Sequence, residues 1–585
     1  MDTTVRKKAL GRGLHPQWRV DKYRDLGWWT DETLDGVFSS RVAERGDALA
    51  IVDPANLVAL QGIEPRRLSW NELDAEVSAL AARLLDHGIG RGDVVGVQLP
   101  NTIELVEVYL AAWRIGAIVS PLAMQYREHE LVTMGNRASF ATLLTCRTLS
   151  GRHHAAEAAA VADRIDSLRS VVIYDRSPDE AGQPAVAEHW APGPASAEQL
   201  DRVARHLSDS CDDPNDCVTI CWTSGTESEP KGVQRTHYDW LAFSWACVDA
   251  PNVVTEDVLL NPFPMINMAG ICGMLLPWLR TGSLLVQHHP FDPPTFFGQI
   301  ARERVTYTLV PPALLWALIN NEEMLARVDL SSLTRVGSGS APLQPPMVRG
   351  WQQRFGISVI NFFGSNEGVG LLSNGEDFPD PDERASFFPR YGAPGTSWAS
   401  RVSEWIELKL IDQESGEEIT EPGRPGELHI SGPMIFPGYV GSDAARSPFD
   451  DDGFLCTGDV FEISGDQGQY LHFLDRAKDV VIRGGMNIAP AELEGMIAAH
   501  PAVAEVAVIG DPDEVMGERV AAVVVLADGQ QLELDHLVGF LQERKIASYK
   551  LPERLEVIDV LPRNPVGKLL KRELRRAPAF SPGPV

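Results

Sequence analysis

The chain has 585 residues and a formal charge of −29, from 52 Lys and Arg against 81 Asp and Glu. Such an acidic chain is a poor match for general nucleic-acid binding or for attachment to an anionic membrane surface. Its length allows for about three to four domains. The segment 562–576, "PRNPVGKLLKRELRR", departs from the acidic balance and concentrates basic residues.

The cysteines and the apolar segments indicate the compartment. An odd number of cysteines, 7, without any CxxC pair, favours free thiols over disulfides or a structural zinc site. The N-terminal segment is basic but has no continuous apolar stretch, and the most apolar region, 263–287, is interrupted by Pro277 and Arg280. We therefore expect a cytoplasmic protein without stable membrane insertion. A homodimer is compatible with the sequence.

Residues 69–122 alternate between helical and strand-like patterns. Ser69 and Glu72 have capping-box spacing before apolar residues at helical periodicity, and Asn101 and Glu104 repeat this spacing before a second helix. Strand-like apolar segments follow the two helices, at 93–99 and 117–122. This alternation predicts a mostly parallel sheet with helices on both faces.

Further elements follow in chain order. Residues 177–216 look like a surface linker with one short helix, and 217–222 form a buried strand. A second α/β stretch covers about 236–365. From 402 the pattern alternates at period two, which is typical of antiparallel hairpins or a barrel. After about 475 a smaller α+β unit follows, with helices expected near 490–499 and 533–545.

These patterns define the expected fold class and domains. We predict an α/β protein with a large N-terminal domain of two α/β subdomains plus a β-barrel, at 1–475. A small, mobile α+β domain should follow at 476–585.

The loop 223–233, "TSGTESEPKGV", follows the buried strand at 217–222. Backbone N–H groups and hydroxyls of such a loop can converge on phosphate oxygens, and Lys231 can add positive charge. The loop does not have the GxxxxGK[ST] spacing. On its own, it is compatible with either a phosphate site or an ordinary surface turn.

Five motifs in order resemble those of the adenylate-forming superfamily, the AMP-dependent synthetases and ligases, which include acyl-CoA synthetases. They are "TSGTESEPKGV" (223–233), "NFFGSNEG" (361–368), "CTGD" (456–459), "LDRAKDVVIRGGMNIAPAELE" (474–494) and "LPRNPVGKLLKREL" (561–574). The resemblance spans about residues 30–576.

The resemblance implies a role for each matching residue. The ATP phosphates should contact Thr223, Ser224, Gly225, Thr226 and Lys231. Glu367, with Thr226, should hold Mg²⁺. Asn361 should reach the adenine amino group, Phe363 should stack on the ring, and Asp459 and Arg476 should bind the ribose. Lys568 should bridge the acid's carboxylate and the α-phosphate, and Lys478 should lie at the hinge. The remaining nucleotide-site candidates are Ser338, Gly339, Ser340, Phe362, Gly364 and Asn366.

Four positions depart from the usual family pattern. Glu227 and Ser228 replace a Thr and a Gly in the loop, and we expect Glu227 and Glu229 to face solvent or a lysine rather than phosphate. Asn366 stands where Thr is usual, and its amide can still donate to a phosphate oxygen. Phe363 replaces the common Tyr but keeps the stacking face.

The acid should be a carboxylic acid without an α-amine. No Asp or Glu occurs between Val258 and Gln287, where amino-acid activators place a partner for the ammonium group. Asn267 lies where many acyl-CoA synthetases have a histidine, so it is either an altered carboxylate gate or a turn residue. The candidate pocket residues are Met265, Ile266, Met268, Ile271 and 337–341. The small residues among them favour an aryl, alicyclic, terpenoid, steroid-like or medium-chain acid.

The acceptor thiol is expected to be coenzyme A. Gly484 and Gly485 would leave space for its pantetheine arm, although two glycines also suit a tight hairpin turn. A carrier-protein thiol is the alternative acceptor, as in stand-alone adenylating enzymes. A second alternative is a non-catalytic nucleotide-binding relative, for which the altered loop is the only support.

Overall fold

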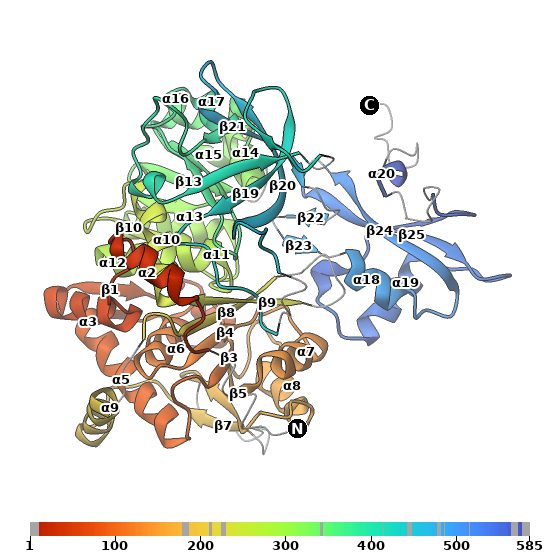
Figure 1. Cartoon of the computed structure of the whole chain (residues 1–585). Coiled ribbons are helices and arrows are strands. Elements are labelled where there is room, and N and C mark those ends of the chain that lie inside the picture. The colour runs from red at the N-terminus through yellow and green to blue at the C-terminus, as the bar shows by residue number, and fades with distance from the viewer. Residues whose placement is uncertain are drawn as a thin grey trace.

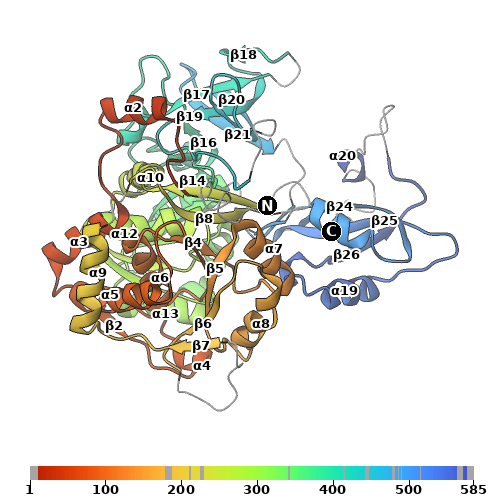
Figure 2. The same cartoon turned by 60° about the horizontal axis from the view of Figure 1, so that its bottom comes forward.

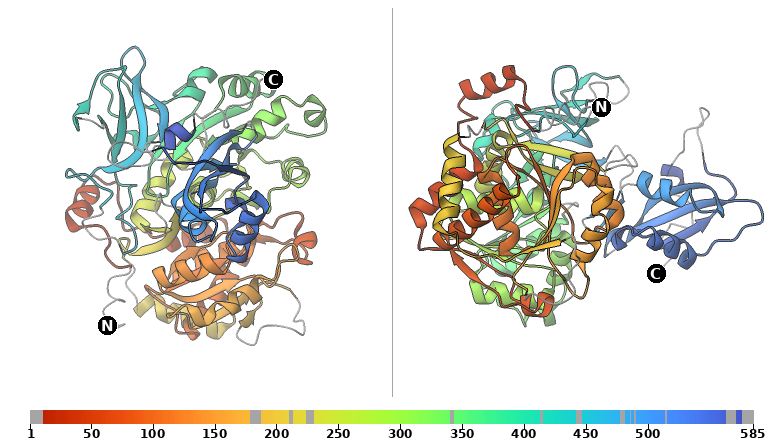
Figure 3. Two further views of the ribbon diagram at one scale, coloured as in Figure 1. Left: turned by 90° about the vertical axis from the view of Figure 1, so that its right-hand side faces the viewer. Right: turned by 90° about the horizontal axis from the view of Figure 1, so that it is seen from below.

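The fold is described from a computed structural model that covers residues 11–177, 187–209, 213–223, 230–339, 343–412, 415–441, 447–476, 481–484, 486–488, 490–513, 515–562 and 571–575. These residues form four β-sheets with helices packed around them. Three sheets build the larger body, and the fourth, nearest the C-terminus, stands against one side of it (Figures 1 and 3).

The first α/β unit holds a sheet of seven strands. Their spatial order is β7 (Ala187–Trp190), β6 (Ser170–Tyr174), β5 (Phe140–Thr145), β3 (Val94–Gln98), β4 (Ile118–Pro121), β8 (Cys217–Thr223) and β9 (Lys231–Thr236). Its helices are α5 (Trp70–Asp86), α6 (Ile103–Arg114), α7 (Glu128–Ala138), α8 (His154–Ala160) and α9 (Ala197–Asp209). All neighbouring strands except β8 and β9 run parallel. The predicted alternation is thereby confirmed.

The second α/β unit holds a sheet of eight strands. Their order is β15 (Gly370–Ser373), β14 (Ser358–Gly364), β13 (Arg335–Gly339), β12 (Tyr307–Leu309), β10 (Val258–Asn261), β11 (Leu284–Gln287), β1 (Leu49–Val52) and β2 (Arg67–Ser69). The helices between these strands are α10 (His237–Asp249), α11 (Met268–Gly270), the π-helix η2 (Ile271–Leu275), α12 (Leu276–Thr281), α13 (Pro293–Glu303), α14 (Pro312–Ile319), α15 (Glu322–Leu325) and α16 (Pro345–Phe355). Further helices are α2 (Gln17–Asp25), α3 (Leu34–Arg45), α4 (Leu57–Gln61) and α17 (Pro381–Ser386).

The third sheet is antiparallel, with the order β16 (Phe387–Pro389), β21 (Tyr470–Arg476), β20 (Leu455–Ser464), β19 (Pro425–Ser431), β17 (Glu407–Ile411) and β18 (Glu418–Ile419). The sequence suggested a barrel here. In the described residues the strand order is an open path that ends at β16 and β18. The end strands, of 3 and 2 residues, do not pair with each other among the described residues.

The C-terminal unit is the small α+β domain that the sequence predicts. Its strands are β22 (Val481–Arg483), β23 (Met486–Ile488), β24 (Val503–Asp513), β25 (Gly517–Leu526) and β26 (Arg554–Val557). Its helices are α18 (Pro490–Ile497), α19 (Leu534–Glu543) and α20 (Lys571–Leu574), with the 3₁₀ turn η5 (Ser548–Lys550). It has its own apolar core between the sheet and the helices α18 and α19. The chain changes sheets between β21 and β22, and the exact boundary at 475/476 stays a prediction.

Two predicted helix starts have different outcomes. Ser69 and Glu72 form the expected capping box at α5. Asn101 is not the cap of α6, so that prediction is wrong. The helix begins at Ile103, whose backbone N–H donates to Asp53 Oδ1 at 3.0 Å. The Asn101 side chain instead donates to Phe263 O at 2.7 Å and accepts from Met265 N at 3.2 Å, because a tertiary contact outweighs the local cap.

The linker expected at 177–216 contains more structure than the pattern indicated. Besides the helix α9, it supplies β7, which pairs in parallel with β6 at the edge of the first sheet. Its sequence, "AEHW", has no continuous apolar run because an edge strand is only half covered.

The described residues agree with the expectations on cysteines and membrane spans. The six cysteines in the described ranges are free. Among these residues, no helix has the length and apolar character needed to cross a bilayer. Within the same ranges, no three His, Cys, Asp or Glu side chains are grouped as a metal site.

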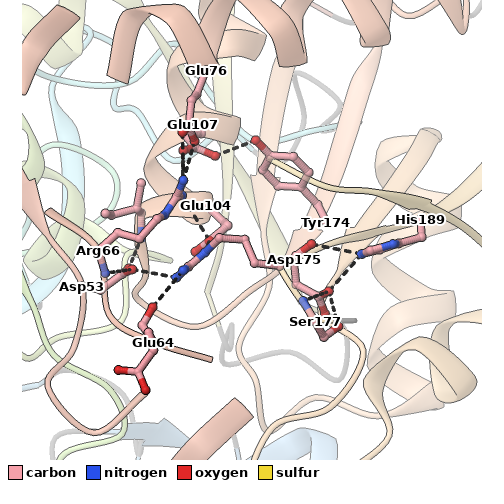
Figure 4. A network of polar contacts seen from close by, with 12 residues as sticks. Asp53, Glu64, Arg66, Glu76, Glu104, Glu107, Tyr174, Asp175, Ser177 and His189 are labelled. Carbon is pink, nitrogen blue, oxygen red and sulfur yellow. Dashed lines mark hydrogen bonds and ion pairs between the residues drawn. The ribbon is translucent and has the colours of Figure 1, made fainter. Parts of the chain in front are cut away.

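A buried ionic network lies between α5, α6, β6 and the loop before β2 (Figure 4). Arg66 contacts Glu76 at 2.8 Å, Glu104 at 3.4 Å and Glu107 at 3.3 Å. Arg176 adds contacts to Asp53 at 2.9 Å and Glu104 at 2.8 Å. Four carboxylates thus share two guanidinium groups, and burial, reinforced by Glu76 and Glu104, raises the pKa of Glu107 well above its ordinary value.

This network predicts that stability falls as the pH rises above the ordinary pKa range of a carboxyl group. A carboxyl group whose pKa is raised in the folded state stabilises the fold at low pH, and this contribution is lost as the pH rises through the raised pKa. Glu107→Gln, which keeps a neutral group in place, should flatten the decline in the free energy of unfolding above neutral pH. Urea midpoints of both proteins from about pH 6 to 9.5 measure this slope.

Glu104→Gln is the matched comparison for this test. The pKa of Glu104 is lowered because Arg176 and Arg66 outweigh its burial, so it is ionised in the fold. Its neutralisation should cost about 3 kcal/mol at every pH in the range. Equal slopes for the wild type and Glu107→Gln would contradict the assignment of a neutral Glu107.

Candidate active site

The phosphate-loop candidate connects two antiparallel strands of the first sheet. Thr223, the last residue of β8, pairs with Lys231, the first residue of β9. The loop residues Ser224, Gly225, Thr226, Glu227, Ser228 and Glu229 lie outside the described residues. Both ends of the loop are therefore placed, and the orientation of the two glutamates stays a prediction.

Glu367 and Lys231 both contact the side chain of Tyr439. Tyr439 Oη donates to Glu367 Oε1 at 2.9 Å, and Lys231 Nζ lies 5.1 Å from the centre of the Tyr439 ring. Tyr439 is held beside β9 by a bridge between Val233 and Tyr439. The carboxylate of Glu367 and the ammonium group of Lys231, from distant parts of the chain, thus lie beside one tyrosine at the start of β9.

Arg235 is the buried support of this cluster. Its guanidinium group donates to Asp239 Oδ1 at 2.6 Å, to Asn366 O at 2.7 Å and to Met434 O at 2.9 Å. Arg235 and Asp239 are both fully buried. Burial alone would raise the pKa of Asp239, but Arg235 and His15 lower it, so Asp239 stays ionised opposite the arginine. The arginine fixes the backbone next to Glu367.

The sequence did not single out Arg235 or Tyr439. Arg235 lies near the end of β9 between the polar residues Gln234 and Thr236, where no apolar or helical pattern marks it. Tyr439 follows Pro437 and Gly438 in an irregular loop, and no local pattern assigns it to Glu367.

Asn366 and Asn267 both cap the short helix α11. Asn366 Oδ1 accepts from Met268 N at 2.8 Å, and Asn267 Oδ1 accepts from Ala269 N at 3.1 Å. Asn267 thus makes the local bond expected of a turn residue, and its role as a carboxylate gate stays a prediction. These bonds use the side-chain oxygens, and each amide nitrogen keeps its donor capacity toward a ligand.

The next two nucleotide candidates lie on neighbouring parallel strands. Ser338 on β13 pairs in register with Asn361 on β14. Asn361 Nδ2 donates to Arg384 O at 3.2 Å and to Ala385 O at 3.0 Å. This leaves its side-chain oxygen as the group that can accept from an adenine amine. Ser338 Oγ donates to Val310 O at 2.7 Å.

Gly339 and Gly364 are required by close backbone contacts. A Cβ on Gly339 would lie 2.1 Å from Phe362 O, and one on Gly364 would lie 2.9 Å from Val369 O. Phe363 is partly buried and lies in an aromatic cluster, 5.1 Å from Phe461 and 5.5 Å from Phe473 between ring centres. Its stacking role toward adenine stays a prediction.

The ribose candidates face each other across two antiparallel strands. Asp459 on β20 pairs with Arg476 on β21. The backbone N–H of Asp459 donates to Thr457 Oγ1 at 3.1 Å, a local turn that orients the residue. Two residues that are 17 positions apart are thereby brought together.

Several predicted residues lie beyond what is described: Lys568, Lys478, Ser340 and Gly485. Gly484 is described and has a left-handed backbone with φ +54° at the turn between β22 and β23. Gly484 therefore lies in a turn between two antiparallel strands, and its role beside pantetheine stays a prediction.

The expected room at Gly337 is filled in the structure. A Cβ there would lie 2.4 Å from Leu309, 2.7 Å from Phe362 and 2.9 Å from Tyr307 Oη. These side chains cover the glycine, so its small size serves packing rather than open space. The Tyr307 hydroxyl is buried and has no hydrogen-bond partner among the described residues.

The fold and this site define the class of adenylate-forming enzymes. The family model described as "AMP-binding enzyme" matches residues 38–440, and "AMP-binding enzyme C-terminal domain" matches 492–568. The chain belongs to the AMP-binding enzyme family.

Curated relatives extend over nearly the whole chain. The chain is 29% identical over 558 residues to the medium-chain fatty-acid–CoA ligase of Escherichia coli (strain K12), covering 95% of this chain and 92% of that protein. It is 29% identical over 570 residues to the 2,3-dihydroxybenzoate-AMP ligase of Bacillus subtilis (strain 168), covering 96% of each.

A solved structure with a similar fold is the amide bond synthetase McbA from Marinactinospora thermotolerans. It has 25% sequence identity and a TM-score of 0.74, and the match covers 93% of this chain and 99% of that one.

Proposed function

We propose that the protein is an acid–thiol ligase that activates a carboxylic acid with ATP and transfers the acyl group to coenzyme A. The observation that supports this best is the cluster of Glu367, Tyr439 and Lys231 at the end of the candidate phosphate loop. The matches over 38–440 and 492–568 support the same activity.

The chemistry requires positive charge where the anions meet. A carboxylate oxygen attacks the α-phosphorus of ATP, the bond to the β-phosphate oxygen breaks, and pyrophosphate leaves. Lys231 and Lys568 would supply the charge that offsets the anionic oxygens. In the second step the thiol sulfur attacks the acyl carbon, AMP leaves, and the thiol proton passes to solvent.

Glu367 is the residue that would hold Mg²⁺. Its carboxylate offers the hard oxygen ligand that Mg²⁺ prefers, and phosphate oxygens, water and Thr226 would complete the shell. The hydrogen bond from Tyr439 occupies one of its oxygens and leaves the other available. When bound, the ion would neutralise charge on the phosphates.

Glu367→Gln should raise the Mg²⁺ concentration needed for half-maximal adenylation by about tenfold and lower the maximal rate by ~10²-fold. Pyrophosphate release measured across a Mg²⁺ titration tests this. Tyr439→Phe is the milder comparison and should retain most of the maximal rate. An unchanged Mg²⁺ requirement in Glu367→Gln would contradict the role of this carboxylate.

The acid is proposed to be a carboxylic acid without an α-amine. Residues 258–287 contain no carboxylate that could pair an ammonium group. The unpaired Tyr307 hydroxyl beside Gly337 adds a reason to compare acids with and without a hydroxyl or carbonyl substituent. Aryl, alicyclic and medium-chain acids form the panel.

The test is pyrophosphate release from ATP for each acid of the panel, with and without coenzyme A. Acyl-CoA and AMP as products support the proposed ligase. Acid-dependent release that never yields acyl-CoA would favour an adenylating enzyme that serves a carrier protein. No release with any acid would favour the nucleotide-binding relative without turnover.

A further inference from the structure

The small domain contacts the large one at the start of α7. Figures 1 and 2 show α7 next to the C-terminal unit. Residues 128–130 of α7 meet residues 545–550, the segment between α19 and β26. We call this the docking contact.

Two charges are buried at the centre of the docking contact. Lys550 Nζ lies 3.7 Å from Glu130 Oε1, and the two side chains are only 3% and 1% exposed. The same carboxylate oxygen accepts from Ala547 N at 3.3 Å. Lys550 Nζ also lies 5.7 Å from the centre of the Tyr126 ring. The carboxylate thus binds both a side chain and the backbone of the other domain.

A second pair lies at the rim of the docking contact. Lys545 pairs with Glu128, and these side chains are 50% and 19% exposed. Glu128 also contacts Arg164 Nη1 at 3.2 Å within the large domain. Water competes for this outer pair, which therefore contributes little, whereas removal of the Glu130 charge takes from the buried Lys550 the carboxylate that lies 3.7 Å from its Nζ.

The docking contact determines which side of the small domain lies toward the large domain. In Figure 1 the strands β22 and β23, which carry the turn at Gly484, lie on the side of the small domain nearer to the large domain. Helix α20, three residues after Lys568, lies farther away and is tied within the small domain by Lys571 and Glu494 at 2.6 Å. In this orientation the strands β22 and β23, which flank Gly484, lie nearer to the large domain than helix α20 does.

We propose that Glu130 and Lys550 are positioning residues that hold the small domain in the orientation for acyl transfer to the thiol. The inference rests on the proposed function for the identity of the two half-reactions. The pair is buried only while the domains are docked, so its strength bears on the choice of orientation. Neither domain's own core depends on it.

The variant Glu130→Gln separates charge from helix capping. Glu130 Oε2 accepts from Arg127 N at 3.0 Å and thereby caps α7, and a glutamine can keep this bond. Lys550→Met removes the other charge while keeping a chain of similar length. The matched control is Lys545→Gln, which changes the exposed pair of the same contact.

The experiment measures the rates of the two half-reactions and the hydrogen exchange of one peptide. In Glu130→Gln, thioester formation from preformed acyl-AMP should slow at least tenfold, and acid-dependent pyrophosphate release should change less than twofold. Hydrogen exchange of a peptide containing Ala547 should accelerate at least tenfold. Lys545→Gln should stay within twofold in all three measurements. The double variant Glu130→Gln with Lys550→Met should regain most of the transfer rate, because both charges of the buried pair are then removed together.

The outcomes separate this inference from the proposed function. Unchanged exchange at Ala547 in Glu130→Gln overturns the inference, whether or not the protein turns over any acid. Equal losses in both half-reactions also overturn it, since the pair would then serve general stability. Faster exchange in a protein that adenylates no acid would retain the docking role and reject the proposed ligase.

Discussion

Replacing Lys568 by alanine should slow acid-dependent adenylation by ~10²–10³-fold, the usual cost of removing a charge-stabilising donor from a transition state. Transfer from preformed acyl-AMP to coenzyme A should change only about twofold, because the developing charge at the α-phosphorus is absent from that step. Pyrophosphate release and single-turnover thioester formation measure the two effects separately.

Lys571→Ala is the control for Lys568→Ala. Lys571 lies in the same basic segment, but its ammonium group is paired with Glu494 at 2.6 Å within the small domain. It should leave adenylation nearly unchanged. A comparable loss in both variants would show that the segment acts through its overall charge, and would contradict a specific role for Lys568.

Arg235→Met should lower the free energy of unfolding by about 3–5 kcal/mol, because removal of one partner leaves a buried charge uncompensated. Asp239 would keep His15 at 3.2 Å and the Thr236 backbone, but would lose the Arg235 contact at 2.6 Å. The carbonyl groups of Asn366 and Met434 would also lose their donor. Adenylation should fall because Glu367 follows Asn366 directly.

Urea denaturation and pyrophosphate release test the Arg235 prediction together. Arg205→Met is the matched control, since Arg205 forms an i,i+4 pair with Asp201 on the surface of α9, with both side chains more than 60% exposed. It should alter stability by less than about 0.5 kcal/mol. Equal stability of Arg235→Met and the wild type would contradict the supporting role.

The sequence predicted the strands and the order of units well, because buried parallel strands give continuous apolar runs. The segment 93–99 became β3, and 117–122 became β4. The capping box of Ser69 was visible because both its residues are local. The residue that caps α6 could not be predicted in this way, because Asp53, which accepts from Ile103 N, lies 50 residues earlier in the chain.

In the candidate site, too, local motifs could be predicted from the sequence and long-range contacts could not. Motif matches proposed Glu367, Asp459 and Lys231 by residue type and order, and their roles stay predictions. The supports Arg235 and Tyr439 act through contacts across 131 and 72 positions, to Asn366 and Glu367, and single-chain patterns carry no signal for them. The filled space at Gly337 was also hidden, because a glycine looks the same whether it leaves room or admits neighbouring side chains.

The most direct test of the account follows one oxygen atom. An accepted acid labelled with ¹⁸O in both carboxylate positions is converted with ATP and coenzyme A, and the phosphorus products are analysed by mass spectrometry. Attack of the carboxylate on the α-phosphorus predicts one ¹⁸O in AMP and none in pyrophosphate. Unlabelled AMP, with the isotope in inorganic phosphate or pyrophosphate, would contradict the adenylate mechanism.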